Sequence, residues 1–134
     1  MGVLFIAAPE SPFGVLQLVP HAPDTTYDAL WLHYLRAHSL RLTRLIHYLG
    51  ITTIFAGIAA AVIADTWWYG VAGLVAGYLI AFSAHYTVQH NRPVLFEGPR
   101  ATFWSAGCAL RMYFLGITGQ LGAHLQRAGV DSSA

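Results

Sequence analysis

The chain contains no lysine, and charged residues of all kinds make up only 10% of its 134 residues, whereas 56% are hydrophobic. A soluble domain usually carries about a quarter charged residues, so this deficit indicates a protein that has lipid as its solvent. The formal net charge of +1 gives no field that would attract a polyanion, which argues against a nucleic-acid partner. At this length we expect a single domain or one membrane unit.

Only one cysteine is present, Cys108, which excludes an intrachain disulfide and any metal site built from paired thiolates. A metal site would therefore need histidine, carboxylate or amide ligands. We expect Cys108 to have a packing role only. The chain contains no P-loop, no dinucleotide-binding fingerprint and no arrangement that suggests a nucleophilic triad.

Two apolar runs, residues 46–64 and 67–88, are each long enough to cross a bilayer as a helix. A hydrocarbon core of about 30 Å needs roughly 20 helical residues at about 1.5 Å each. Only Asp65 and Thr66 separate the runs, so we expect a tight turn and an antiparallel transmembrane hairpin. A hairpin buried in a soluble core would show the same two runs.

Glycines interrupt these runs, among them Gly57 and Gly70, and two others, Gly73 and Gly77, have the small-xxx-small spacing that lets helix backbones approach closely. This spacing favours close packing of the two helices of the hairpin. It would equally suit the contact between two protomers of a homodimer.

The two ends of the hairpin differ in composition, which predicts its orientation. Trp67, Trp68 and Tyr69 lie at the turn, where aromatic rings commonly mark a membrane interface. Arginines flank the opposite end, and the positive-inside rule makes that end cytoplasmic. Exclusive use of arginine is a hint of a GC-rich bacterial genome, so the expected location is a bacterial inner membrane.

The segments that flank the hairpin predict helices that lie at the membrane surface. Residues 25–39 are amphipathic, with Thr25 or Thr26 as the N-cap, and should form a helix at the cytoplasmic interface. Residues 101–125 are apolar but hold Arg111 near their centre. Because a charge in mid-bilayer is costly, an interfacial or re-entrant helix is favoured over a third span.

The predicted organisation is a loose N-terminal segment (1–24), one membrane domain (25–125) and a disordered tail (126–134). Pro93 should end the second helix of the hairpin, because proline lacks an amide hydrogen and disfavours helical geometry in the preceding residue. The predicted fold class is all-α and integral to the membrane: an antiparallel transmembrane helix hairpin with flanking interfacial or re-entrant helices.

Two histidines fall at the same depth of this hairpin. His47 lies 18 residues before Asp65 and His85 lies 19 after Thr66, so their levels differ by roughly one residue. Facing imidazoles at one level form a candidate metal site. A single interfacial histidine is usually only an amphipathic side chain, so the prediction depends on several histidines converging.

His38 lies nine residues before His47, which is half a turn out of phase on a continuous helix. It reaches the site only if the chain bends between residues 38 and 43. Either Ser39 or Thr43 could cap a new helix there, because both side chains accept hydrogen bonds from free backbone amides.

Gln89 lies four residues after His85, on the same helical face, and His90 could turn inward as that helix ends. Either side chain could supply a further ligand. The other histidines receive no role: His33 is expected to be structural, His21 to lie in a loop, and His124 to be exposed.

Two motifs at the open end of the hairpin carry a resemblance to a known family. The segment LHYLRAHSLRLTRLIHYLG enters the first run, AHYTVQHNRPVLFEGP leaves the second, and ALRMYFLGITGQL follows downstream. Together they resemble the membrane-embedded 2-hydroxy-fatty-acid dioxygenases first recognised in yeast (Mpo-like), formerly a domain of unknown function, over roughly residues 27–121.

The resemblance implies an Fe(II) enzyme that uses O2 to shorten a long-chain 2-hydroxy fatty acid by one carbon, the α-oxidation reaction of lipid metabolism. His38, His47 and His85 match the histidines of the family motifs. The glutamate of the family falls at Gln89 and its lysine at His90, so His90 would serve as a replacement ligand. Gln89 stays a candidate catalytic residue.

The substrate would lie with its acyl chain along the hairpin and its carboxylate at the cytoplasmic end. Arg44 or Arg92 could hold that carboxylate through two parallel hydrogen bonds, with Asn91 beside them. Two alternatives stay open. One is a membrane protein that binds haem between His47 and His85, and the other is a structural relative that lost its activity with the carboxylate at position 89.

Overall fold

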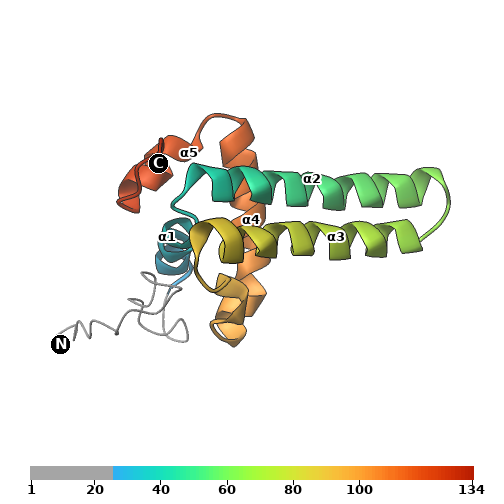
Figure 1. Cartoon of the computed structure of the whole chain (residues 1–134), viewed down its shortest axis with the longest axis horizontal. Coiled ribbons are helices and arrows are strands. Elements are labelled where there is room, and N and C mark those ends of the chain that lie inside the picture. The colour runs from blue at the N-terminus through green and yellow to red at the C-terminus, as the bar shows by residue number, and fades with distance from the viewer. Residues whose placement is uncertain (1–25) are drawn as a thin grey trace.

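Two long helices dominate the computed structural model, which describes residues 26–134 (Figure 1). Helix α2 (Arg41–Ile63) and helix α3 (Trp68–Ala84) lie antiparallel and extend away from the rest of the chain. Helix α3 continues into a turn of π-helix, η2 (His85–Gln89). The helical runs and the tight turn are therefore confirmed, although α2 begins five residues before the predicted start at residue 46.

Glycines set the closeness of α2 and α3. A Cβ added at Gly57 would lie 2.7 Å from the Cα of Gly73, and one added at Gly50 would lie 2.6 Å from the carbonyl oxygen of Gly77. No side chain fits at these crossings, so the backbones touch where the small-xxx-small spacing predicted close packing. The spacing is used within one chain and gives no support to a homodimer.

The outer surface of this pair is apolar and largely exposed. In the described residues, α2 and the continuous helix Trp68–Gln89 are the two helices long and apolar enough to cross a membrane, and only 22% of the most apolar stretch of each is buried. The core helices of a soluble protein would be mostly buried. Large exposed patches of this kind mark contacts with lipid or protein.

Shorter helices gather at the open end of the pair, away from the turn (Figure 1). Helix α1 (Tyr27–Ala37) has Thr26 as its N-cap, whose side chain accepts a hydrogen bond from Ala29 N–H at 3.3 Å, as predicted. A short 3-10 helix, η3 (Val94–Phe96), leads to α4 (Pro99–Ile117), which lies across the pair in Figure 1, and to α5 (Leu121–Arg127).

The residues 101–125 do not form the single helix that the sequence suggested. Helix α4 ends at Ile117, and Gly119, with φ of +74°, turns the chain into α5. Arg111 lies 4.4 Å from the centre of the Trp31 ring, so a cation–π contact accommodates its charge against α1. The core formed by α1, α4 and α5 includes Leu35 and Cys108.

The last residues also differ from the prediction of a disordered tail over 126–134. Helix α5 continues to Arg127, and the chain then returns to the start of α2, where Arg41 N–H donates to the backbone oxygen of Ala134 at 2.7 Å. The free amides of a helix start need acceptors, and these residues supply one. The predicted loose segment 1–24 lies outside the described residues, as does His21.

Candidate metal centre

The chain bends where the sequence required it. Helix α1 ends at Ala37 and α2 begins at Arg41, so His38 lies at the break between them. Its side chain can therefore lie on the same side as His47, which a continuous helix would not allow. The predicted caps are wrong, however. Neither Ser39 nor Thr43 caps α2, and its N-cap is Leu40, without a side-chain cap.

The side chain of Gln89 holds the bend together. Its Oε1 accepts from Leu40 N–H at 3.1 Å and from the Thr43 hydroxyl at 2.8 Å, and its Nε2 donates to Ser39 Oγ at 2.7 Å. These contacts use both ends of the amide. Gln89 therefore fastens the end of the second long helix to the bend, and the structure does not bring it into the histidine cluster as a ligand or base.

Arg44 has a similar structural role. Its Nη1 donates to the carbonyl oxygens of His38 at 2.9 Å and Ser39 at 2.6 Å, which are acceptors left free at the end of α1. Its side chain is buried and lines no part of the cavity next to the histidines. The expected role of Arg44 in binding the substrate carboxylate there does not fit this position.

His90 is turned away from the other histidines. It adopts a left-handed conformation, with φ of 54°, at the end of the π-helix, and Asn91 N–H closes the turn by donating to the carbonyl of His85 at 2.9 Å. The imidazole of His90 is exposed. The structure therefore does not place His90 as a fourth ligand. Arg92, a candidate for binding the substrate carboxylate, is exposed as well.

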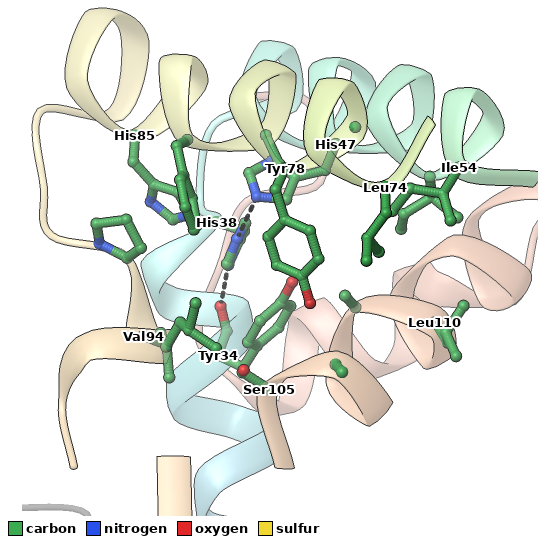
Figure 2. A pocket seen from close by; sticks show the side chains of 18 of the residues that line it. Tyr34, His38, His47, Ile54, Leu74, Tyr78, His85, Val94, Ser105 and Leu110 are labelled. Atoms are coloured by element: carbon green, nitrogen blue, oxygen red, sulfur yellow. Dashed lines mark hydrogen bonds between the residues drawn. The ribbon is translucent and has the colours of Figure 1, made fainter. Parts of the chain in front are cut away.

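Three histidines do converge. His38 comes from the bend, His47 from the second turn of α2, and His85 from the first residue of the π-helix, and all three are buried. One ring nitrogen from each lies within 4.8 Å of the others (Figure 2). Among residues 26–134 this is the one cluster of three or more histidine, cysteine or acidic side chains with that spacing.

The hydrogen bonds of the outer nitrogens determine the tautomers. Nδ1 of His38 lies 2.6 Å from the carbonyl oxygen of Tyr34, and Nδ1 of His47 lies 2.9 Å from that of Thr43. Carbonyl oxygens only accept, so both Nδ1 atoms carry the proton and donate. The inward Nε2 atoms of these neutral rings are lone-pair donors suited to a metal ion.

Asn91 orients the third ring. Its Nδ2 donates to the carbonyl of Ala37 at 2.9 Å, which leaves its Oδ1 to accept from Nδ1 of His85 at 2.7 Å. His85 is thereby held in the same tautomer as the other two histidines. Asn91 was expected beside the substrate, but in the structure it supports a ligand and ties the chain after the π-helix to the end of α1.

The contact between the inward nitrogens suits a shared cation. Nε2 of His38 lies 3.1 Å from Nε2 of His47, and with both protons on Nδ1 this contact joins two lone pairs. Two imidazole nitrogens bound to one ion at about 2.1 Å lie about 3.0 Å apart at a right angle and about 3.4 Å apart at the tetrahedral angle. The donor set therefore fits a metal ion that prefers nitrogen ligands.

Burial keeps the cluster neutral. Loss of solvation lowers the pKa of His38 well below its ordinary value, and the neighbouring imidazoles of His47 and His85 lower this pKa further. The Nε2 lone pair of His38 is thus available at neutral pH without first losing a proton. This is the protonation state that a metal ligand needs.

An apolar cavity of about 290 Å³ opens from the histidines and runs between α2, α3 and α4 (Figure 2). Its walls are mainly aliphatic and aromatic, and they extend to Ile58 on α2 and Leu74 on α3. The hydroxyl ends of Tyr34 and Tyr78 point into it. Sequence reasoning missed both tyrosines, although Tyr34 lies four residues before His38, one helical turn away.

His33, Glu97, His124 and Cys108 lie outside this cavity. His33 forms a pair with Glu97, with 2.6 Å between Nε2 and Oε2, and His124 accepts from the indole of Trp31 at 3.2 Å. His124 is therefore partly covered, where the sequence suggested an exposed residue. Burial raises the pKa of the Cys108 thiol to about 11, which agrees with a packing role.

Replacing Asn91 with alanine should lower metal affinity about 10- to 100-fold, because the ring of His85 loses the acceptor that fixes its tautomer and orientation. Asn91→Asp restores an acceptor for that ring and should recover part of the affinity. Competition with a chromogenic chelator measures both variants. Equal affinity in the wild type and Asn91→Ala would contradict the role assigned to Asn91.

Comparison with known proteins supplies one match. No curated protein and no solved structure matches the chain. The family model described as 2-hydroxy-palmitic acid dioxygenase Mpo1-like matches residues 25–121, which contain α1 to α4 and all three clustered histidines. The chain belongs to the Mpo1-like family.

Proposed function

We propose that the protein is an Fe(II)-dependent dioxygenase that removes one carbon from long-chain 2-hydroxy fatty acids at a membrane surface. The observation that carries the proposal is the placement of three neutral, inward-facing imidazoles at the end of an apolar cavity. The name of the family supports the substrate class and the reaction.

His38, His47 and His85 would hold the ion through their Nε2 atoms. Imidazole ligands suit Fe(II), and three of them leave positions open on a six-coordinate ion. A ferrous ion, when bound, supplies a centre for activating O2 beside the 2-hydroxy acid. The overall reaction balances with one O2 and no other reductant: R–CH(OH)–COOH and O2 give R–COOH, CO2 and water.

The cavity suits an acyl chain. Ile58 lies 11 residues after His47, and Leu74 lies 11 before His85, so the walls extend about 16 Å from the histidines at about 1.5 Å per residue. Each C–C bond of about 1.5 Å advances an extended chain by about 1.25 Å, so this length holds roughly a dozen methylene groups. The remaining carbons of a longer chain would extend toward lipid.

Tyr34 and Tyr78 would orient the head group. No arginine lines the cavity, so the substrate carboxylate has no guanidinium partner there, and its charge would be balanced by the ion. Burial raises the pKa of Tyr34 well above its ordinary value, which keeps this phenol a neutral donor. The two hydroxyls are the donors best placed to bind the 2-hydroxyl or carboxylate oxygens.

Tyr78→Phe should therefore weaken substrate binding or positioning, with a loss of about 10-fold in kcat/KM from one missing hydrogen bond of about 1.5 kcal/mol. Iron content should stay at the wild-type value, because Tyr78 makes no hydrogen bond to Nδ1 of any of the three clustered histidines. Steady-state O2 consumption measures the effect. Unchanged kinetics would remove Tyr78 from the proposed head-group site.

The proposal also places α2 and the helix Trp68–Gln89 across a bilayer, with the metal centre at the end where Arg36, Arg41 and Arg92 lie. The positive-inside rule makes this the cytoplasmic end, in keeping with a bacterial inner membrane. Helix α4, which lies across the pair in Figure 1, would rest at the interface.

The haem alternative is less well supported. A haem iron offers two axial positions to the protein, whereas three imidazoles meet here. His38 Nε2, 3.1 Å from His47 Nε2, occupies space that a porphyrin between His47 and His85 would need. The inactive-relative alternative predicts protein that retains no metal, which the following experiment tests directly.

The test uses purified protein loaded with Fe(II) without air and then given O2 and 2-hydroxyhexadecanoate labelled with ¹³C at C1. We expect about one iron per chain, labelled CO2, and a fatty acid one carbon shorter. Hexadecanoate without the 2-hydroxyl is the control and should not be consumed. Iron-loaded, folded protein that consumes no O2 with either acid would overturn the proposal.

A further inference from the structure

A second cavity, of about 270 Å³, lies between the first turns of α2, the end of α4, α5 and the last residues of the chain. None of the clustered histidines lines it. The residues that matter for its chemistry are Arg41, Arg44, Tyr48, Gly116, Gly122 and Ser132. The start of α2, α5 and the chain end meet at this place in Figure 1.

Arg44 brings a buried positive charge to this cavity. Arg44 is 3% exposed, and its hydrogen bonds go to carbonyl oxygens: His38 and Ser39, with Ser132 at 3.0 Å. Among residues 26–134, no aspartate or glutamate forms an ion pair with Arg44. A buried charge without a counter-ion is costly.

A second cation adjoins the first. Arg41 lies one turn before Arg44 on α2, lines the same cavity and is exposed. Within the part of the chain that the structure describes, no aspartate or glutamate lines the cavity. The hydroxyl-bearing side chain of Tyr48 completes a wall that carries two positive charges and neutral hydrogen-bond donors, which is the donor set for an oxyanion.

We propose that this cavity binds a phosphate group, carried either by the head group of an anionic phospholipid or by phosphate in solution. Planar guanidinium groups match phosphate oxygens through paired hydrogen bonds. Basic pockets beside membrane-spanning helices suit lipid head groups. Gly122, which lines the cavity, has no side chain to fill it, and a Cβ added there would meet no atom within 4 Å.

The site is independent of the proposed reaction but linked to the fold of the metal centre. Arg44 also donates to the carbonyl of His38, so an anion that holds Arg44 also secures the bend that presents this ligand. Bound phosphate should therefore raise the thermal stability of the protein, as any ligand of the folded state does.

Two variants probe the cavity without touching Arg44. Arg41→Gln removes the exposed charge, and Gly122→Leu fills the open space. Arg92→Gln is the matched control, because it removes the same charge from an exposed position outside the cavity. Metal content is measured for each variant and shows that the fold around the histidines is retained.

The full chain is reconstituted in nanodiscs that contain phosphatidylcholine with or without phosphatidylglycerol, and native mass spectrometry counts retained lipids. A parallel thermal-unfolding titration uses inorganic phosphate. We expect about one phosphatidylglycerol per chain for the wild type and Arg92→Gln, and at least a fivefold loss for the other two variants. Protection by inorganic phosphate alone, lost in the same variants, would instead identify phosphate in solution as the ligand.

The proposal is overturned if neither phosphatidylglycerol nor phosphate binds. It is equally overturned if all four proteins bind the same amount, because the cavity would then not be the binding site. The result does not depend on turnover, so failure of the proposed dioxygenase activity leaves this test intact.

Discussion

Replacing His47 with alanine should reduce metal affinity at least 100-fold and abolish turnover. The variant removes one of three inward nitrogens, and loss of a residue that merely supports a ligand already costs about 10- to 100-fold. Two nitrogens would remain, and among residues 26–134 no acidic side chain joins them. The amide oxygen of Gln89 cannot replace the lost ligand, because it already accepts two hydrogen bonds at the bend. Metal content after dialysis against a weak chelator measures the effect.

His90→Ala is the matched control for this prediction, because it makes the same change at an exposed histidine outside the cluster. It should keep the metal content and activity of the wild type. Retained iron in His47→Ala, with helical content unchanged by circular dichroism, would contradict the three-histidine site. Loss of iron in His90→Ala would return that residue to the ligand set.

The sequence was informative about the level of the histidines and the need for a bend. Nearly equal distances of His47 and His85 from the turn place both at about one depth, because a straight helix rises by a constant amount per residue. The phase of His38 required a break before α2, and the structure places one there. These predictions follow from helix geometry alone and need no side-chain contacts.

The partners of the bend could not be predicted in the same way. The sequence analysis predicted a metal ligand at Gln89 and a partner for the substrate carboxylate at Arg44. Both side chains have suitable polar groups and lie close to the histidine motifs in the sequence. Which acceptors and donors a bend leaves free depends on where each helix ends, and helix ends are poorly specified by sequence patterns. The π-helix at His85 is a further example, since it turns His90 away from the cluster.

The position of Asn91 shows how a motif can be recognised and its role misjudged. The Asn91–Arg92–Pro93 sequence marks the end of a helix, which the structure confirms. The same turn brings the amide of Asn91 beneath the ring of His85 and the carbonyl of Ala37. His85 is 6 residues from Asn91 in the sequence and Ala37 is 54 residues away. Only the three-dimensional path of the chain brings both within hydrogen-bonding distance of the Asn91 side chain.

Gly57→Ala should lower the free energy of unfolding by about 1–3 kcal/mol, the usual cost of overpacking a close contact. The added Cβ would lie 2.7 Å from the Cα of Gly73 and 2.8 Å from the carbonyl oxygen of Tyr69. Both are backbone atoms, so α2 and α3 must move apart. Because His47 and His85 lie on these two separate helical segments, metal affinity should fall as well.

Gly70→Ala provides the control, because its Cβ would meet only the Cβ of Ala61, at an ordinary 3.7 Å. The same substitution should therefore be neutral there, or stabilising by up to about 1 kcal/mol from the higher helix propensity of alanine. Denaturant titration of both variants in detergent, followed by circular dichroism, measures the difference. Identical unfolding midpoints would mean that α2 and α3 do not approach as closely as their glycines indicate. A midpoint lowered in Gly57→Ala alone, accompanied by loss of metal, would tie the glycine contact between the helices to the geometry of the histidine cluster.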